Sequence, residues 1–257
     1  MNGYRRRQAI ESRLAESGDV AVVDLARDLN VSEMTVRRDL EALEGAGVLI
    51  RVHGGAVSRA GRSYEPPRVE RATRAPAAKE AIGRAAAALV GEGDSAIIDV
   101  GTTTLELARA LRGKHGLTVV TPSLPVAYEL GDEPGIRVLV TGGTLRSGEL
   151  SLVGPGAEDA FRELNCDVVF LGVAGVAVAE GLTEYSLDDT RVKRAAIRSA
   201  RRVVALVDAT KLGRVALANV CPLSGVDVLV TDAPAANPVV AAMVEAGVEI
   251  LRAEVAA

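Results

Sequence analysis

Apolar residues near the start of the chain recur every three or four positions, the spacing of short amphipathic helices. Three helices are predicted, over residues 5–17, over residues 22–30 and from a cap at Ser32 to Gly45. In the third helix, Val36, Leu40 and Leu43 share one buried stripe. Ser32 suits the N-cap position because its hydroxyl accepts a hydrogen bond from an amide of the first turn.

The outer side of the third helix and the segment after it carry groups suited to DNA. Met34, Thr35 and Arg38 project away from the buried stripe. Residues 49–52 predict a short strand, and His53-Gly54-Gly55 predicts a tight turn. An arginine and a hydroxyl on a helix with a packed back fit a major groove. The pattern predicts a winged helix-turn-helix, with a plain three-helix bundle as the alternative.

The run TVRRDLEALEGAGVLIRVHGGA, residues 35–56, resembles the N-terminal domain of the DeoR family of bacterial transcriptional regulators. That pattern has paired arginines and Asp-Leu in the recognition helix, then Leu-Glu, a glycine-bounded turn, and Arg-x-His-Gly-Gly-Ala in the wing. The matching residues are Arg37, Arg38, Asp39, Leu40, Leu43, Glu44, Gly47, Arg51, His53, Gly54, Gly55 and Ala56. The resemblance implies binding to double-stranded operator DNA.

Six residues of this head are candidates for DNA contacts: Ser32, Thr35, Arg37, Arg38, Arg51 and His53. Thr35 and Arg38 are expected at base edges, where Arg38 can hold guanine through two hydrogen bonds. Arg37, Arg51 and His53 are expected at phosphates, which set the register on DNA. The alternatives are wing packing for Arg51 and His53, and for Arg37 a surface ion pair with Asp39 or Glu41.

Composition indicates a soluble globular protein with a sizeable core, because 48% of the 257 residues are hydrophobic and 25% are charged. We predict a head over residues 1–57, a linker over 58–75 and a larger α/β domain over 76–257. We see no leader pattern and no apolar run long enough to span a bilayer. A cytoplasmic location without membrane association is therefore expected.

The whole chain has a net charge of −4, and its head has no excess of basic residues. Residues 1–57 hold eight arginines and no lysine against nine acidic residues, whereas most DNA-binding domains are basic overall. The basic residues concentrate in the recognition helix, the wing and the linker. We therefore expect modest non-specific affinity for DNA and a strong dependence on salt.

The cysteines and histidines do not form a metal-binding pattern. Cys166 and Cys221 lie far apart in the chain, and His53 and His115 make no zinc-type spacing with them. The cysteines are expected to be small buried apolar residues. We expect neither a metal nor a cofactor.

Beyond residue 76, apolar runs alternate with amphipathic segments. Strands are predicted at residues 96–100, 117–120, 136–140, 168–171, 203–207, 226–230 and 248–251. Helices are predicted at residues 77–90, 103–112, 155–164, 187–201 and 237–246. Apolar β-branched strands separated by helices are typical of a mostly parallel, Rossmann-like sheet covered on both faces.

Glycine, threonine, aspartate and lysine residues gather after these strands, where open α/β folds bind ligands. In residues 99–104, Gly101 allows a tight turn and three threonines open a helix, whose amides can hold a phosphate or carboxylate. An ordinary helix cap is the alternative. The candidate ligand-binding residues are Asp99, Gly101, Thr102, Thr103, Thr104, Gly142, Gly143, Gly172, Gly175, Thr183, Asp189, Lys193, Asp208 and Lys211. Asp189 and Lys193 could instead be an i,i+4 surface pair.

These segments also resemble the C-terminal sensor domain of the DeoR family, which resembles sugar-phosphate isomerases in fold. The resemblance implies that the Gly-Thr-Thr turn, residues 101–103, binds the phosphate of a phosphorylated sugar effector. Residues 208–211 match an Asp-x-Ser-Lys-like segment, and residues 189–193 match a Glu-Ala-x-Val-Lys-like segment.

Three departures from that pattern bear on the ligand. Asp189 stands for the usual glutamate and Thr210 for serine. Ala174 stands where many relatives carry aspartate or asparagine, and it cannot hydrogen-bond a sugar hydroxyl or act as an acid or base. This last change puts the usual effector in question and disfavours an isomerase.

Together these patterns predict a transcriptional regulator, a repressor of a carbohydrate operon, rather than an enzyme. The expected partners are operator DNA, a phosphorylated sugar or related metabolite, and further copies of the chain in a dimer or higher oligomer. One alternative is a sugar-phosphate isomerase-like enzyme using Lys193, Lys211, Asp189 and Asp208. The other is a DNA-binding protein whose second domain only oligomerises.

Overall fold

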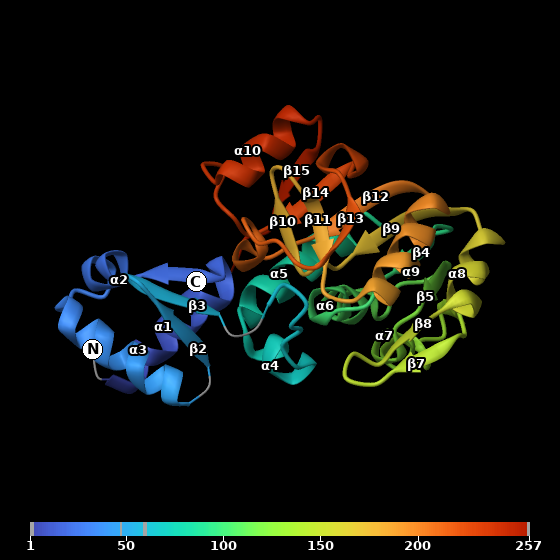
Figure 1. Ribbon diagram of the computed structural model, residues 1–257. Coiled ribbons are helices and arrows are strands. Elements are labelled where there is room, and N and C mark those ends of the chain that lie inside the picture. The colour runs from blue at the N-terminus through green and yellow to red at the C-terminus, as the bar shows by residue number, and fades with distance from the viewer. Residues whose placement is uncertain (1–2, 47, 59–60, 256–257) are drawn as a thin grey trace. The chain divides into compact units, whose positions relative to one another are not determined.

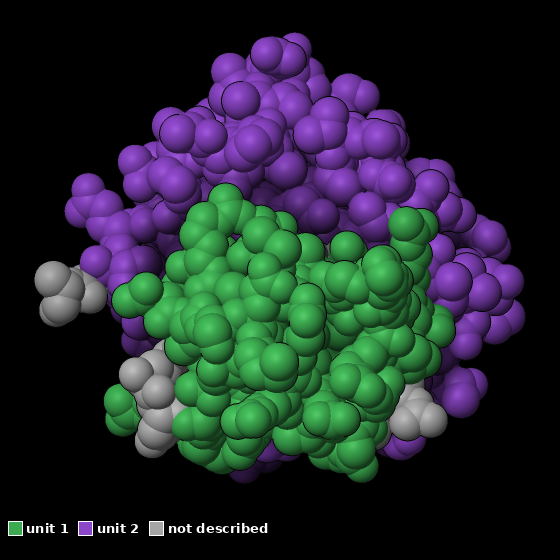
Figure 2. All heavy atoms as spheres, turned by 60° about the vertical axis from the view of Figure 1, so that its left-hand side comes forward, with its two compact units in different colours: residues 1–64 green, residues 65–257 purple. Residues whose placement is uncertain are grey.

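The computed structural model describes residues 3–46, 48–58 and 61–255, and the chain forms two compact units, Met1–Tyr64 and Glu65–Ala257 (Figures 1 and 2). Gly47 of the predicted turn and residues 59 and 60 of the predicted linker lie outside the described residues. Each unit has its own hydrophobic core.

The first unit contains the predicted helices and wing. Its elements are α1 (Gly3–Ser17), β1 (Asp19–Ala21), α2 (Val22–Asp28), α3 (Glu33–Gly45), β2 (Leu49–Val52) and β3 (Gly55–Ser58). Ser32 caps α3 as predicted, because its hydroxyl accepts a hydrogen bond from the Thr35 amide at 3.2 Å. Strand β1 was not predicted; it pairs antiparallel with β3, which lies between β1 and β2.

A buried carboxylate joins the recognition helix α3 to α1. Asp39 is 5% exposed and accepts hydrogen bonds from the guanidinium of Arg6, with Arg7 at 3.6 Å. Around this pair, Ile10 of α1 and Leu40 of α3 lie in the core of the head. The ion pair fixes how α3 sits within the head, so Asp39 has a structural role there.

The second unit is built on one parallel sheet. Its strands are β4 (Ser95–Ile98), β5 (Leu117–Thr121), β6 (Ile136–Val140), β9 (Cys166–Leu171), β12 (Ala200–Leu206), β14 (Val228–Thr231) and β15 (Glu249–Arg252). They lie in the order β15-β14-β12-β9-β4-β5-β6, and every neighbouring pair is parallel. All seven strands correspond to predicted apolar runs.

Helices cover both faces of this sheet, as predicted (Figure 1). One face packs against α5 (Pro76–Ala87), α6 (Thr102–Leu111) and α7 (Leu124–Leu130); the other packs against α8 (Pro155–Arg162), α9 (Leu187–Arg198) and α10 (Pro238–Glu245). Ile97 and Ile98 show the alternation, because they belong to the two different cores. The sequence pattern did not predict α7. The helix predicted over residues 187–201 was too long at its C-terminal end, because α9 ends at Arg198 and β12 begins at Ala200.

Short elements outside the sheet have no clear sequence pattern. They are α4 (Arg68–Thr73), the hairpin β7 (Thr144–Arg146) and β8 (Ser151–Val153), an antiparallel sheet of β10 (Gly175–Ala177), β11 (Gly181–Glu184) and β13 (Ala218–Cys221), and the 3-10 helices Ala209–Lys211 and Leu223–Gly225. Helix α4 lies within the predicted linker segment 58–75. Several of these elements supply side chains to the cavity described below.

Among the described residues, no helix is long and apolar enough to cross a membrane. Within residues 3–46, 48–58 and 61–255, His, Cys, Asp and Glu side chains form no group that could hold a metal ion.

Candidate functional site

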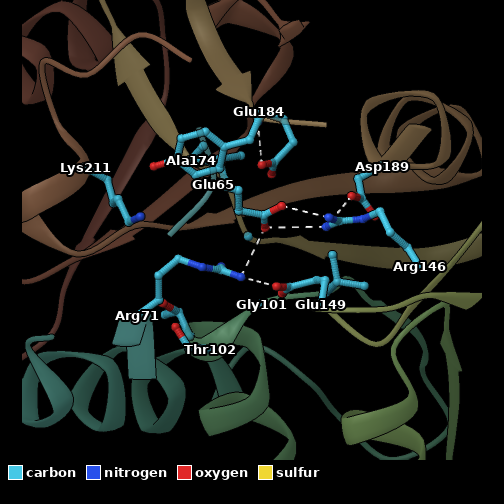
Figure 3. A pocket seen from close by; sticks show the side chains of 15 residues that line it. Glu65, Arg71, Gly101, Thr102, Arg146, Glu149, Ala174, Glu184, Asp189 and Lys211 are labelled. Carbon is cyan, nitrogen blue, oxygen red and sulfur yellow. Dashed lines mark hydrogen bonds and ion pairs between the residues drawn. The ribbon is translucent and has the colours of Figure 1, made fainter. Parts of the chain in front are cut away.

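A cavity, part of it open to solvent, lies in the second unit where β4 and β9 end (Figure 3). This is the carboxyl edge of the parallel sheet, the expected place for a ligand in an open α/β fold. The lining residues are Glu65, Arg71, Val100, Gly101, Thr102, Thr103, Arg146, Glu149, Gly172, Val173, Ala174, Glu184, Tyr185, Asp189 and Lys211.

Two glycines shape this edge of the sheet. Gly101 has a φ of 137°, which a residue with a side chain rarely adopts. A Cβ at Gly172 would lie 2.7 Å from the carbonyl oxygen of Val100, so only glycine allows the two strand ends to approach this closely. The close approach places the first turn of α6 beside the end of β9.

The three threonines that open α6 have different roles. Thr102 and Thr103 line the cavity. Thr104 is fully buried, and its hydroxyl donates to the carbonyl of Gly101 at 3.1 Å, within its own helix. Gly101, the N-cap residue, has no side chain with which to cap the helix. Because the first amides of a helix have no partner within it, this turn suits an anion.

A buried ion pair between Lys193 and Asp99 ties the strand ends together. The Nζ of Lys193 lies 2.5 Å from Asp99 Oδ2 and donates to the carbonyl of Gly172 at 2.8 Å; Glu184 Oε2 lies 3.3 Å away. Burial opposes the charge on Lys193, but the carboxylates of Asp99, Glu184 and Asp189 raise its pKa above the ordinary value. Burial raises the pKa of Asp99 to about 6, against the opposing charge of Lys193.

Neither member of this pair lines the cavity, although both were predicted to bind the ligand. The i,i+4 alternative is not what the structure shows either, because Asp189 pairs with Arg146 at 2.6 Å. Lys193 therefore supports the cavity from within the core.

A network of ion pairs crosses the cavity (Figure 3). Arg71 of α4 pairs with Glu149 and, at 3.1 Å, with Glu65. Arg146 of β7 pairs with Glu65 at 2.7 Å and with Asp189 at 2.6 Å. Burial raises the pKa of Glu149 to about 7, against the opposing charge of Arg71. Two cations thus face three carboxyl groups, one of which is partly protonated near neutral pH.

Helix α4 is held in place by Lys79 of α5. This side chain is 4% exposed, and its Nζ donates to the carbonyls of Arg71 and, at 2.6 Å, Arg74. Burial lowers its pKa. Because Lys79 binds the last carbonyls of α4, it positions the backbone that carries the Arg71 side chain.

Lys211 supplies a further cation to the lining. It lies in the short helix Ala209–Lys211, which Asp208 caps by accepting from the amide of Thr210 at 3.1 Å. Burial lowers the pKa of Lys211 to about 8, against the opposing charge of Asp208. Asp208 does not line the cavity, so the structure gives it a capping role.

Four other predicted residues form turns and packing contacts away from the lining. Gly142 and Gly143 follow β6, and a Cβ at Gly143 would lie 2.6 Å from the carbonyl oxygen of Val153. The Thr183 hydroxyl donates to the carbonyl of Gly175 at 3.2 Å.

The structure brings six of the predicted residues together on the cavity wall: Gly101, Thr102, Thr103, Gly172, Asp189 and Lys211. It does not place the other eight there: Asp99, Thr104, Gly142, Gly143, Gly175, Thr183, Lys193 and Asp208. The sequence missed six polar side chains of the lining or its network: Glu65, Arg71, Arg146, Glu149, Glu184 and Tyr185. They lie on α4, β11, the β7–β8 hairpin and irregular segments, and only the charge of the linker segment hinted at two of them.

In the head, the candidate residues of α3 lie at or near its surface. The Ser32 and Thr35 hydroxyls are 2.9 Å apart. Arg37 pairs with Glu33 at 2.9 Å, rather than with Asp39 or Glu41, and Arg38 is exposed. The head therefore presents Arg38 to solvent on the recognition helix.

The two candidates of the wing are also exposed. Arg51 pairs with Glu44 at 2.7 Å, so the strand is joined to the end of α3 by a surface ion pair. His53 lies in the turn between β2 and β3. The contact of Arg51 with Glu44 agrees with the wing-packing alternative. Breaking an exposed ion pair of this kind costs little free energy.

Comparison with known proteins gives the same two parts. Residues 6–61 match the model of the DeoR-like helix-turn-helix domain, and residues 74–233 match the model of the DeoR C terminal sensor domain. The HTH-type transcriptional regulator GolR of Listeria innocua is 35% identical over 89% of this chain and 90% of that protein. The glycerol-3-phosphate regulon repressor of Escherichia coli K12 is 33% identical over 91% of this chain and 92% of that protein.

A third relative and a solved structure complete the comparison. The putative aga operon transcriptional repressor of Escherichia coli O157:H7 is 32% identical over 96% of this chain and 92% of that protein. Ribose 5-phosphate isomerase A of Methanocaldococcus jannaschii aligns over 52% of this chain and 53% of its own, with 18% identity and a TM-score of 0.39. A likeness at that level says nothing about activity.

The substitution Lys193→Met tests the supporting role of Lys193. It leaves Asp99 buried without its counter-charge, so we expect the free energy of unfolding of the second unit to fall by about 3–5 kcal/mol. Adding Asp99→Asn should recover part of the loss, because the uncompensated charge is then gone. Urea unfolding measures both, with Arg84→Met on the exposed face of α5 as the control. Unchanged stability in Lys193→Met would contradict the supporting role.

Proposed function

The chain belongs to the DeoR family of DNA-binding transcriptional regulators, and we propose that it is a repressor whose affinity for its operator depends on a phosphorylated sugar or related metabolite. The observation that carries this proposal is the cavity at the carboxyl edge of the sheet. It combines an open helix N-terminus with cationic side chains, in a chain that also has a winged head. Relatives that are named repressors of an aga operon and of a glycerol-3-phosphate regulon support the carbohydrate context.

On DNA, α3 would enter the major groove with Thr35 and Arg38 at base edges. Arg37, Arg51 and His53 would contact phosphates on either side. The pairs of Arg37 with Glu33 and of Arg51 with Glu44 are exposed, so these arginines can turn to phosphates at low cost. The binding unit would be a dimer or higher oligomer, because two symmetric heads match the two halves of a palindromic operator.

In the cavity, the phosphate would lie at the first turn of α6, against residues 101–103. Lys211 would provide a compensating charge. Ala174 lines the same space and offers no polar side-chain atom, so the sugar would be recognised by other groups than in relatives with aspartate or asparagine there. The effector would act by binding one arrangement of the protein better than another.

An isomerase-like activity is not favoured. The relatives are named as transcriptional regulators. Of the groups that such an enzyme would use, Lys193 is 1% exposed and held by Asp99 and Glu184, and Asp208 caps a helix. A proton-transfer enzyme needs its acid or base within reach of the substrate.

The substitution Arg38→Ala tests the base contact. We expect it to cost about 1–3 kcal/mol at the preferred operator and to relax base preference at one position. The neighbouring Arg37→Ala is the matched comparison, since loss of a phosphate contact weakens binding to all sequences alike. Gel-shift titration at fixed salt, on an operator selected from a random library, measures both. Unchanged affinity and preference in Arg38→Ala would disprove the base contact.

Thermal-shift and calorimetric titration with a panel of phosphorylated sugars tests the effector site, because specific binding raises the melting temperature. Lys211 with a pKa of about 8 is charged at pH 7 and loses its proton as the pH rises through 8. Since a phosphate ester is fully ionised above pH 7, affinity should fall above pH 8, and Lys211→Met should abolish that fall. If no phosphorylated sugar raises the melting temperature, the sensor role fails and the second unit only oligomerises.

A further inference from the structure

Arg71 and Arg146 form an anion-binding pair in the cavity that is separate from the first turn of α6, and in this structure the carboxylate of Glu65 occupies it. We propose that Glu65 is an internal counter-ion, which a carboxylate group of the effector displaces. The effector class is then a phosphorylated sugar acid, with its phosphate at residues 101–103 and its carboxylate between the two arginines. This inference rests on the proposed effector cavity.

The contacts of Glu65 have the geometry of a bound carboxylate ligand. Its Oε2 accepts from Arg146 Nη1 at 2.7 Å and its Oε1 from Arg146 Nη2 at 3.4 Å, which is a two-point contact with one guanidinium. The same Oε1 accepts from Arg71 Nη2 at 3.1 Å. One carboxylate thus bridges two arginines that line the cavity, as Figure 3 shows.

Both arginines have partners that hold them in place without Glu65. Arg71 pairs with Glu149, and its Nε donates to the carbonyl of Pro66 at 3.0 Å. Arg146 pairs with Asp189 at 2.6 Å. Withdrawal of Glu65 would therefore leave a formed pair of guanidinium groups rather than two free side chains.

Glu65 is also placed where a side chain can move at low cost. Residues 61–67 contain no helix or strand, whereas Arg71 lies on α4 and Arg146 on β7. The Glu65 side chain is 20% exposed, so it is not sealed off from solvent.

The balance of charge favours a carboxylate as the incoming group. The two arginines face Glu65, Glu149 and Asp189. Exchange of one carboxylate for another keeps that balance, whereas a phosphate dianion would add a further negative charge beside Glu149 and Asp189.

Displacement of Glu65 also provides a trigger. Glu65 is the first residue of the second unit, and the chain before it leads back to β3 of the wing. A ligand that takes its place removes the contacts of Glu65 with Arg71 and Arg146, while the Pro66 carbonyl stays bound to Arg71. An effector of this kind binds the state with Glu65 withdrawn better than the state with Glu65 on the arginines, and such a difference is the condition for a change in operator affinity.

The test is calorimetric titration of the full chain with 6-phosphogluconate and glucitol 6-phosphate, which differ only in a carboxylate or hydroxymethyl group at one end. Glu65→Gln removes the competing charge at nearly constant shape. We expect its Kd for 6-phosphogluconate to be lower than that of the unmodified chain by roughly tenfold, with little change for glucitol 6-phosphate. Glu70→Gln is the matched control, since Glu70 pairs with Arg74 in the same segment but does not line the cavity.

Four outcomes separate the explanations. Equal affinity of Glu65→Gln and the unmodified chain for 6-phosphogluconate would overturn the inference and leave the effector cavity standing. The same holds if the unmodified chain binds both probes equally well. If neither probe binds any variant while other sugar phosphates do, the phosphorylated sugar acid is the wrong class; if no sugar phosphate binds at all, the proposed sensor function itself fails.

Should Glu65→Gln unfold more readily, Glu65→Asp, which keeps the charge, gives an independent reading: its affinity should stay near that of the unmodified chain.

Discussion

The buried pair of Lys193 and Asp99 is the interaction on which the rest of the sensor depends. Asp99 directly follows β4 and accepts from the amide of Gly172, while Lys193 on α9 donates to both Asp99 and the Gly172 carbonyl. One lysine therefore joins two strand ends and a helix at the carboxyl edge of the sheet. This contact sets where Gly101 turns into α6, and so where a ligand can lie.

A second group of ion pairs joins Glu65 to Arg71 and Arg146 in the cavity lining. It is less buried than the pair of Lys193 and Asp99. The Lys193 side chain is 1% exposed, whereas the Glu65 side chain is 20% exposed and lies on an irregular segment. Breaking a buried ion pair is costly, whereas a partly exposed pair contributes little stability. The Lys193–Asp99 pair therefore supports the cavity, and the contacts of Glu65 with Arg71 and Arg146 are the ones that the proposed effector would replace.

Much of the fold follows from local sequence pattern, and much of the site does not. The seven strands were predictable because each is a short apolar run, largely buried in the five inner strands and partly exposed in the edge strands β6 and β15. Helix α3 was predictable from its stripe and its cap at Ser32. The Gly-Thr-Thr turn was recognisable by its chemistry. In contrast, Arg71, Arg146 and Glu65 meet through contacts between residues 65 and 146, in segments without periodicity. The burial of Lys193 was missed because an isolated lysine on a helix is usually solvated.

If the proposed function holds, ligand binding in the cavity and operator binding at the head are coupled. The decisive experiment measures the operator Kd of the full chain with and without a saturating phosphorylated sugar, and the Kd of that sugar with and without operator, at one salt concentration. We expect the sugar to weaken operator binding by roughly 5–150-fold and the operator to weaken sugar binding by the same factor. An operator Kd that is unchanged by a saturating, tightly bound sugar would contradict it.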